Sequence, residues 1–420
     1  MKISIEDLKR IQEWLKMLSD YCIELSDSDG YLDEEEYSEL PDKMEIEDIP
    51  LEFPDDQEVT VVPTEDFVTY MSEMDMIRRV GDCIVRTDHV IQTVINSNRL
   101  GYYGFDDRLY SMKFRGENFD AAIIESPFLV GVMNAKEGRY DEDFGIGSCY
   151  SYTAIEIITE DVMDDSSILQ LVEKICFYLT TKLDVAVYPW PGHDISEIYD
   201  RMDDYYDEDN NNEESEDGDV IIDVDELPGY TPLLKMYRQA AGVDDPEIQF
   251  LQYYKIIEFV SPVVARFVAY EQLNKKLDLL PAIKRDYKYL ESIIAVVHRY
   301  DKDMRDNALA ASVIENCVDV LPLYEMLPER LRKMVRGNVK LQKDSLTSAD
   351  VNDEQLRGIK GNVAAIFYAT RNSIVHAKSN YEVTGNEMTA DELPTGNDIM
   401  KIIALSIINW NQRQAEGFRV

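Results

Sequence analysis

Residues 352–376, NDEQLRGIKGNVAAIFYATRNSIVH, specify the fold of the C-terminal half of this chain. Apolar residues recur in this stretch every three or four positions, which is the spacing of one face of an α-helix. The stretch ends with Arg371 and His376, and a polar, loop-like sequence follows them. We therefore expect one long helix that ends soon after His376. The apolar positions are Leu356, Ile359, Val363, Ile366 and Phe367.

The same periodicity continues on both sides of this helix and predicts an all-α bundle for residues 230–420. No segment of this region has the alternating pattern of a strand. The other expected helices span residues 246–279, 281–297, 308–321, 323–335 and 398–412.

The N-terminal part has a different pattern and predicts an α+β domain over residues 1–198. An amphipathic helix is expected at residues 3–25 and another at 166–182, with short β-prone segments punctuated by glycines between them. The chain is therefore expected to be multidomain, with an N-terminal α+β domain and a C-terminal all-α helical bundle. The β-prone segments are 58–62, 109–114, 121–125, 128–133, 154–159 and 184–190.

An acidic, low-complexity stretch separates the two parts. Fourteen of residues 200–226 are Asp or Glu, against the single Arg201. Such a composition cannot bury enough apolar surface to fold alone, so residues 199–229 are expected to form a disordered linker. This linker is either a simple spacer or an acidic strip that competes with RNA for a basic site.

The net charge of −41 is confined to the N-terminal half. Residues 231–420 contain 25 Lys and Arg and 25 Asp and Glu, so residues 1–230 hold 17 basic and 58 acidic residues. The acidic half would repel nucleic acid, whereas the neutral half with local basic patches can still bind it. The acidity either regulates such binding or serves solubility alone.

Composition excludes several other classes of function. The five cysteines are scattered without a Cys-x-x-Cys pair, which favours reduced thiols in a cytoplasmic protein over disulfides or zinc. Nucleotide-binding loops and metalloprotease motifs are absent, and we expect no metal and no cofactor. Residues 27–36 resemble a calcium loop, but Leu25 stands at the first ligand position and cannot coordinate calcium. No run of eighteen apolar residues occurs, so a membrane location is not expected.

The chemistry-bearing residues lie in Arg371-Asn372-Ser373-Ile374-Val375-His376. An arginine remains a cation at all ordinary pH values, and a histidine exchanges a proton near neutrality. Together they can stabilise a phosphorane and transfer a proton during phosphodiester cleavage. On an unbroken helix Arg371 and His376 are rotated about 140° apart. They converge only if the helix unwinds or if two chains combine their residues.

This stretch resembles the motif of the HEPN superfamily (higher eukaryotes and prokaryotes nucleotide-binding domain), which is often written Arg-Asn-x-x-x-His. Residues 250–258, with Tyr254 followed by Glu258, are similar to an early HEPN helix. The resemblance covers about residues 231–420 and says nothing of residues 1–230.

The resemblance implies a metal-independent endoribonuclease that acts as a homodimer, of the kind found in bacterial toxins and antiviral phage-defence effectors. His376 would be the general acid or base, Arg371 would stabilise the phosphorane, and Asn372 would orient the site. Glu258 would hold Arg371 or the His376 tautomer, or act only in a helix cap or salt bridge. The N-terminal domain would then sense a ligand or a protein partner.

A non-catalytic interpretation also remains open. Arg371 and His376 also suit a plain helix C-terminus, where cations interact favourably with the helix dipole. The bundle would then be a non-catalytic HEPN-like module for dimerisation or nucleotide binding.

A dense basic run lies at residues 330–343, and Lys378 lies two residues after His376 in the expected loop. Arg332, Lys333 and Arg336 are the expected contacts to an RNA backbone. Alternatively, the run is only a solvated helix face.

Overall fold

The computed structural model describes residues 2–26, 43–54, 56, 59–97, 109–140, 148–149, 152–190, 220–278, 287–303, 306–343, 345–376 and 384–420. The chain divides into two compact units, Met1–Leu227 and Pro228–Val420. We call them unit 1 and unit 2. Unit 1 is rich in sheet and unit 2 is helical, as expected. Within the described residues, no helix is both long and apolar enough to cross a membrane.

Unit 1 is built on a mixed sheet in the order β13-β9-β10-β11-β8-β7-β6, to which β12 adds by pairing with β8. All neighbours are antiparallel except β13 and β9, which are parallel. The strands are β6 (Arg78–Val80), β7 (Ile84–Arg86), β8 (Val90–Ser97), β9 (Met112–Arg115), β10 (Phe119–Glu125), β11 (Thr153–Thr159), β12 (Val187–Pro189) and β13 (Val220–Asp223).

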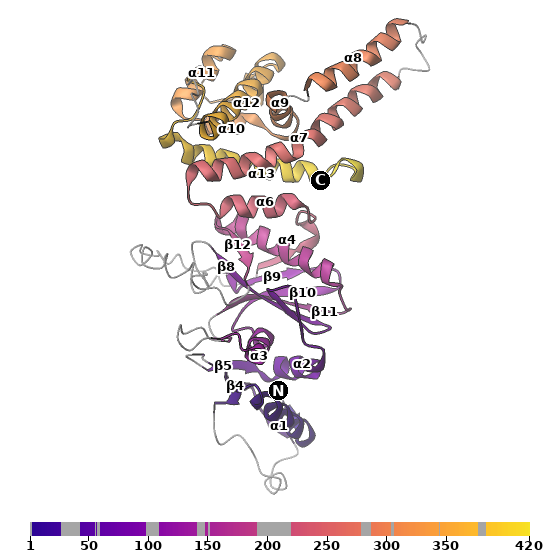
Figure 1. Ribbon diagram of the computed structural model, residues 1–420, viewed down its shortest axis with the longest axis vertical. Helices are drawn as coiled ribbons and strands as arrows, with labels where there is room; N and C mark the ends of the chain where they lie inside the picture. The colour runs from indigo at the N-terminus through magenta and orange to yellow at the C-terminus, as the bar shows by residue number, and fades with distance from the viewer. Residues whose placement is uncertain are drawn as a thin grey trace. The chain divides into compact units, whose positions relative to one another are not determined.

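Two separate apolar cores cover the two faces of this sheet. One face carries Ile91, Ile155 and Ile157 and packs against helix α4 (Asp165–Leu183). Val90 and Val94 of β8 point to the opposite face, where they join Phe128 in the second core. Helix α4 and the helices of the second core lie on opposite sides of the sheet (Figure 1).

The remaining elements of unit 1 lie around the second core, except η4, whose Val224 belongs to the first core. The short sheets pair β1 with β3 and order the other three strands as β2-β4-β5. These elements are β1 (Lys2–Ser4), α1 (Ile5–Ser19), β2 (Glu24–Leu25), β3 (Lys43–Glu45), β4 (Asp48–Glu52), β5 (Thr60–Pro63), α2 (Thr64–Ser72), η2 (Met74–Met76), α3 (Phe128–Glu137) and η4 (Val224–Glu226).

Two expectations for unit 1 were wrong. Residues 128–133, expected as a strand, form the first part of helix α3, whose residues Phe128–Ala135 are all buried. An apolar run this short does not distinguish a buried strand from a buried helix. The range expected for the disordered linker, residues 199–229, also extends too far, because residues 220–223 form strand β13 and pair with β9. Residues 191–219 lie outside the described ranges.

Unit 2 packs its long helices around an apolar centre. Helix α7 contacts α6, α9 and α13, and α12 contacts α9 and α11. The C-terminal part of α7 forms a hairpin with α8 that projects from the other helices (Figure 1). The elements are α6 (Pro232–Ala241), α7 (Pro246–Leu277), α8 (Tyr287–Asp303), α9 (Asp306–Cys317), α10 (Val320–Met326), α11 (Glu329–Val339), η5 (Ser348–Asp350), α12 (Asp353–Val375), η6 (Ala390–Glu392), α13 (Leu393–Gln412) and η7 (Glu416–Phe418).

Candidate functional site

Helix α12 carries the Arg-Asn-x-x-x-His motif and is fixed at both its start and its buried face. Asn352 caps the first turn through a reciprocal pair of hydrogen bonds with Gln355. Further along, Phe367 stacks on Phe250 of α7 with ring centroids 6.0 Å apart. Because this contact lies one turn before Arg371, it sets the position of the motif relative to α7.

Arg371 reaches from α12 to α7 and forms an ion pair with Glu258. Its Nη2 donates to Glu258 Oε1 at 3.1 Å, and its Nη1 donates to Asn372 Oδ1 at 3.1 Å. The Arg371 side chain is 30% exposed and that of Glu258 is 48% exposed. Arg371 therefore contacts two of the other three expected catalytic residues at a solvent-accessible surface.

His376 is the residue at which α12 ends. The last helical residue is Val375, and the backbone N–H of His376 donates to the Asn372 carbonyl at 2.9 Å. The His376 side chain is exposed. The helix is regular up to Val375, so Arg371 and His376 leave it in different directions.

The chain beyond His376 is fixed where it returns at Thr384. The carboxylate of Glu387 accepts hydrogen bonds from the backbone N–H groups of Thr384 and Gly385, at 2.7 and 2.8 Å. The Met388 N–H donates to Thr370 Oγ1 at 3.0 Å, which ties this return to the turn of α12 that bears Arg371. Lys378 lies outside the described residues.

The basic run divides into structural cations and cations that line a surface hollow. Arg332 Nη1 donates to the Glu325 carbonyl at 3.0 Å, and Lys333 pairs with Glu329 at 2.5 Å. Lys333 also lines a hollow of about 460 Å³ together with Arg336 and Lys340. The structure thus brings Lys333 and Arg336 to one hollow, whereas Arg332 is not among the residues that line it.

Sequence reasoning missed a pair of titratable residues in unit 1. His89 Nδ1 meets Glu73 Oε1 at 2.5 Å, and Thr87 Oγ1 donates to Glu73 Oε2 at 2.6 Å. Burial opposes ionisation of Glu73, but the hydrogen bonds from Thr87 and His89 together lower its pKa. The residues of this pair show no motif spacing that would single them out in the sequence.

A second polar group was missed because its members are far apart in sequence. Glu156 Oε2 accepts hydrogen bonds from Tyr70 Oη and Gln92 Nε2, each at 2.6 Å. Burial raises the pKa of Glu156, the nearby charge of Asp66 adds to this, and the two hydrogen bonds oppose it. Tyr70 and Gln92 precede Glu156 by 86 and 64 residues, so no short motif joins them.

Among the described side chains, no group of three or more His, Cys, Asp or Glu residues could hold a metal ion. The calcium-like segment at 27–36 lies outside the described residues.

Comparison with known proteins identifies no relative. No family model matches the chain, and neither a curated protein nor a solved structure matches it. Function is therefore inferred from the residues and contacts described above.

Proposed function

We propose that unit 2 is a metal-independent HEPN-type endoribonuclease and that the protein acts as a regulated toxin or phage-defence effector. The observation that supports it best is the Glu258–Arg371–Asn372 contact beside the exposed His376 at the end of α12. Arg371 supplies a fixed cation, and His376 supplies an imidazole, the side chain that most often transfers protons in catalysis.

The proposed reaction is attack of a ribose 2′-hydroxyl on the adjacent phosphate. His376 removes the 2′-hydroxyl proton while the new bond from O2′ to phosphorus forms. Arg371 stabilises the charge of the phosphorane. The bond from phosphorus to O5′ then breaks, and O5′ takes up a proton. The products are a 2′,3′-cyclic phosphate and a 5′-hydroxyl end.

A homodimer would complete this site. Within one chain Arg371 and His376 point away from the helix axis in different directions. A second copy placed against the same surface would bring Arg371 of one chain toward His376 of the other. Two exposed apolar side chains adjoin the motif residues in sequence, Val375 at 47% and Phe259 at 43% exposure. Exposed apolar groups of this kind are typical of a surface that becomes covered.

RNA would be held by phosphate contacts outside the cleavage site. Lys333, Arg336 and Lys340 line one hollow, and several cations around one concavity attract a polyanion. Unit 1 would oppose this attraction, because the acidic residues of the chain are concentrated in its N-terminal half. A harmful nuclease needs an inactive state, and like-charge repulsion of RNA provides one.

The alternative is a non-catalytic module for dimerisation or nucleotide binding. One contact favours it: Glu258 already neutralises Arg371, as expected for a purely structural ion pair. In that case the motif would stabilise the junction of α7 and α12 without performing chemistry.

Cleavage of total RNA by the full-length chain in the presence of EDTA distinguishes the two functions. We expect the wild type to cleave and His376→Ala and Arg371→Ala to lose cleavage by at least about 100-fold. Arg357→Ala is the matched control, because Arg357 lies on the exposed face of the same helix. Equal cleavage by the wild type and His376→Ala would show that His376 does not take part in cleavage. The motif would then have only a structural role.

A further inference from the structure

Among the described residues of unit 1, no element covers part of one face of the sheet. On β8 the residues that point to this face, such as Val90 and Val94, are buried in the second core. On β9 and β10 the corresponding residues Lys113, Arg115 and Asp120 are exposed. The uncovered region is therefore the part of the sheet formed by β13, β9, β10 and β11.

Strand register places two rows of side chains across this region. Ile221 lies beside Lys113, Lys113 beside Ala122, and Ala122 beside Glu156. The neighbouring row contains Arg115, Asp120 and Ile158 in the same strand order. Residues two apart on a strand share a face, so both rows point to the same side. The rows are Ile221–Lys113–Ala122–Glu156 and Asp223–Arg115–Asp120–Ile158.

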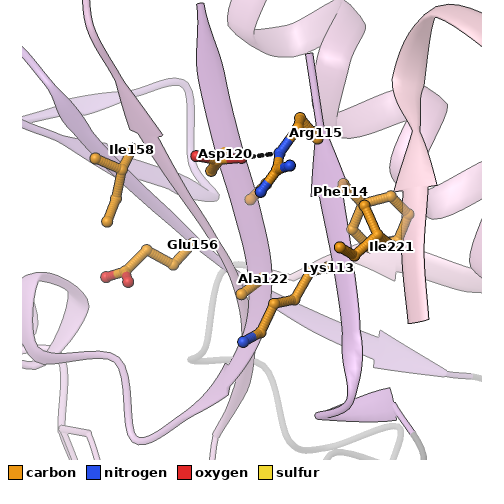
Figure 2. Close-up of a pocket in the computed structure, with 9 residues that line it drawn as sticks. Lys113, Phe114, Arg115, Asp120, Ala122, Glu156, Ile158 and Ile221 are labelled. Carbon is orange, nitrogen blue, oxygen red and sulfur yellow. Dashed lines mark hydrogen bonds and ion pairs between the residues drawn. The ribbon is translucent and has the colours of Figure 1, made fainter. Parts of the chain in front are cut away.

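All members of these rows except Asp223 line a cavity of about 250 Å³, together with Phe114 and Ala121. Figure 2 shows Lys113 and Glu156 on either side of Ala122, with the Arg115–Asp120 ion pair at one end. Ala122 leaves room above the sheet because its side chain is a single methyl group. Ile158 and Ile221 are 46% and 59% exposed and supply the apolar part of the wall.

Glu156 supplies the negative charge of this cavity. Its carboxylate is partly buried, and both hydrogen bonds it accepts, from Tyr70 and Gln92, fall on Oε2. Within the described ranges, Oε1 accepts no hydrogen bond. A carboxylate removed from water is stabilised by a cation, and without one its charged form is disfavoured. Burial indeed raises the pKa of Glu156.

Lys113 places a positive charge at the other side of the same cavity. Neighbouring strands lie about 4.8 Å apart, so the two strand spacings from Lys113 to Glu156 separate their backbones by about 10 Å. The Lys113 side chain extends toward Ala122, whereas the Glu156 side chain extends away from Ala122 on the other side of that strand (Figure 2). A cavity with a carboxylate at one end and an ammonium at the other is complementary to a ligand of the opposite polarity.

We propose that this cavity binds a small zwitterion, with its ammonium group on Glu156, its carboxylate on Lys113 and a short apolar stem over Ala122. The cavity is smaller than the range of about 300–1,000 Å³ that suits drug-sized ligands, so the ligand is of metabolite size. A phosphate-rich nucleotide fits poorly, because Glu156 and Asp120 would repel it. Every lining residue belongs to unit 1, so the site does not depend on the proposed nuclease.

Calorimetric titration of the full-length chain tests the site. The probes are 4-aminobutyrate and the standard amino acids, with butylamine and butyrate as compounds that each carry one of the two charges. At least one zwitterion should bind with a Kd below about 1 mM, and both single-charge compounds should bind at least about tenfold more weakly.

Variants separate this cavity from other sites. Glu156→Gln removes the charge without changing the shape, and Ala122→Leu fills the space without touching Glu156. Both should lower affinity at least about tenfold. Glu125→Gln is the matched control, because Glu125 lies on the strand of Ala122 and does not line the cavity, and it should bind as the wild type does. The proposal is overturned if no zwitterion binds below 1 mM, or if Ala122→Leu binds with unchanged affinity.

Discussion

Arg330 and Glu392 form an ion pair at 2.8 Å that joins the first turn of α11 to the turn before α13. The same guanidinium donates to the carbonyls of Gly385 and Glu387 at 2.7 and 2.6 Å. Arg330 belongs to the basic run that suggested RNA contact, yet its hydrogen-bonding groups are engaged within the protein. It holds the segment through which the chain returns after His376.

We expect Arg330→Ala to destabilise unit 2 by about 1–3 kcal/mol, because it leaves the partly buried carbonyl of Glu387 without its donor and also removes the hydrogen bond to the Gly385 carbonyl. Urea unfolding followed by circular dichroism measures this change. Lys333→Ala is the control, since its partner Glu329 and Lys333 itself are both about 70% exposed and such pairs contribute about 0–1 kcal/mol. Equal loss of stability in the two variants would contradict the assigned role of Arg330.

Substitutions of Glu258 test whether RNA cleavage depends on the contact that holds Arg371 in position. Glu258→Gln keeps an acceptor for Arg371, and we expect it to retain most of the RNA cleavage of the wild type. Glu258→Ala removes the acceptor and should reduce cleavage about 10- to 100-fold, because misplacement of a catalytic group by about 1 Å can cost that much. Stability should change by less than about 1 kcal/mol in both variants, since the pair is partly exposed. Greater activity of Glu258→Ala would show that Glu258 inhibits the site.

The raised pKa of Glu156 predicts a pH dependence of a definite sign. The folded chain holds the Glu156 proton more tightly than the unfolded chain does, so this residue stabilises the fold at low pH. Its contribution falls as the pH rises from the ordinary Glu pKa through the raised folded value. The free energy of unfolding of Glu156→Gln relative to the wild type should therefore increase over this range. A difference that is constant between pH 4 and pH 8 would contradict the raised pKa.

Gly131 and Gly361 should respond to alanine in opposite ways. A Cβ at Gly131 in α3 would lie 2.6 Å from Cys149 Cβ and 2.7 Å from Phe53 Cε1, so Gly131→Ala should destabilise unit 1 by about 1–3 kcal/mol. A Cβ at Gly361 in α12 meets nothing within 4 Å, and Gly361→Ala should stabilise unit 2 by about 0.5–1 kcal/mol. Thermal unfolding of both variants checks these signs. A neutral Gly131→Ala would mean that α3 shifts freely in its core.

The helices were the most predictable part of the fold, because the residues of an apolar helix face recur every three or four positions in the sequence. Residues 353–375 form α12, and residues 246–277 form α7, almost as expected. Strand β8 was missed because all eight of its residues are buried on both faces of the sheet, so no alternation of polar and apolar residues remains. Helix α3 was misassigned for a related reason, since it too is buried on every side.

The candidate site was predictable only where its residues are close in sequence. Arg371, Asn372 and His376 form a recognisable motif, and the aromatic segment before Glu258 pointed to that residue as well. The Glu156 cavity depends on the pairing of strands that are far apart in the chain, which the sequence does not display. The positions of Arg330 and Arg332 within the protein likewise depend on tertiary contacts to carbonyl groups.

Strand β13 ties the cavity to the chain that leads out of unit 1. Among the described strands its four residues pair only with β9, and Ile221 lines the cavity. Unit 2 begins five residues after the strand ends at Asp223. Release of this edge strand would lengthen the tether between the units by about 13 Å, at about 3.3 Å for each extended residue. Occupancy of the cavity would oppose that release, so a small molecule could set the reach of the helical unit.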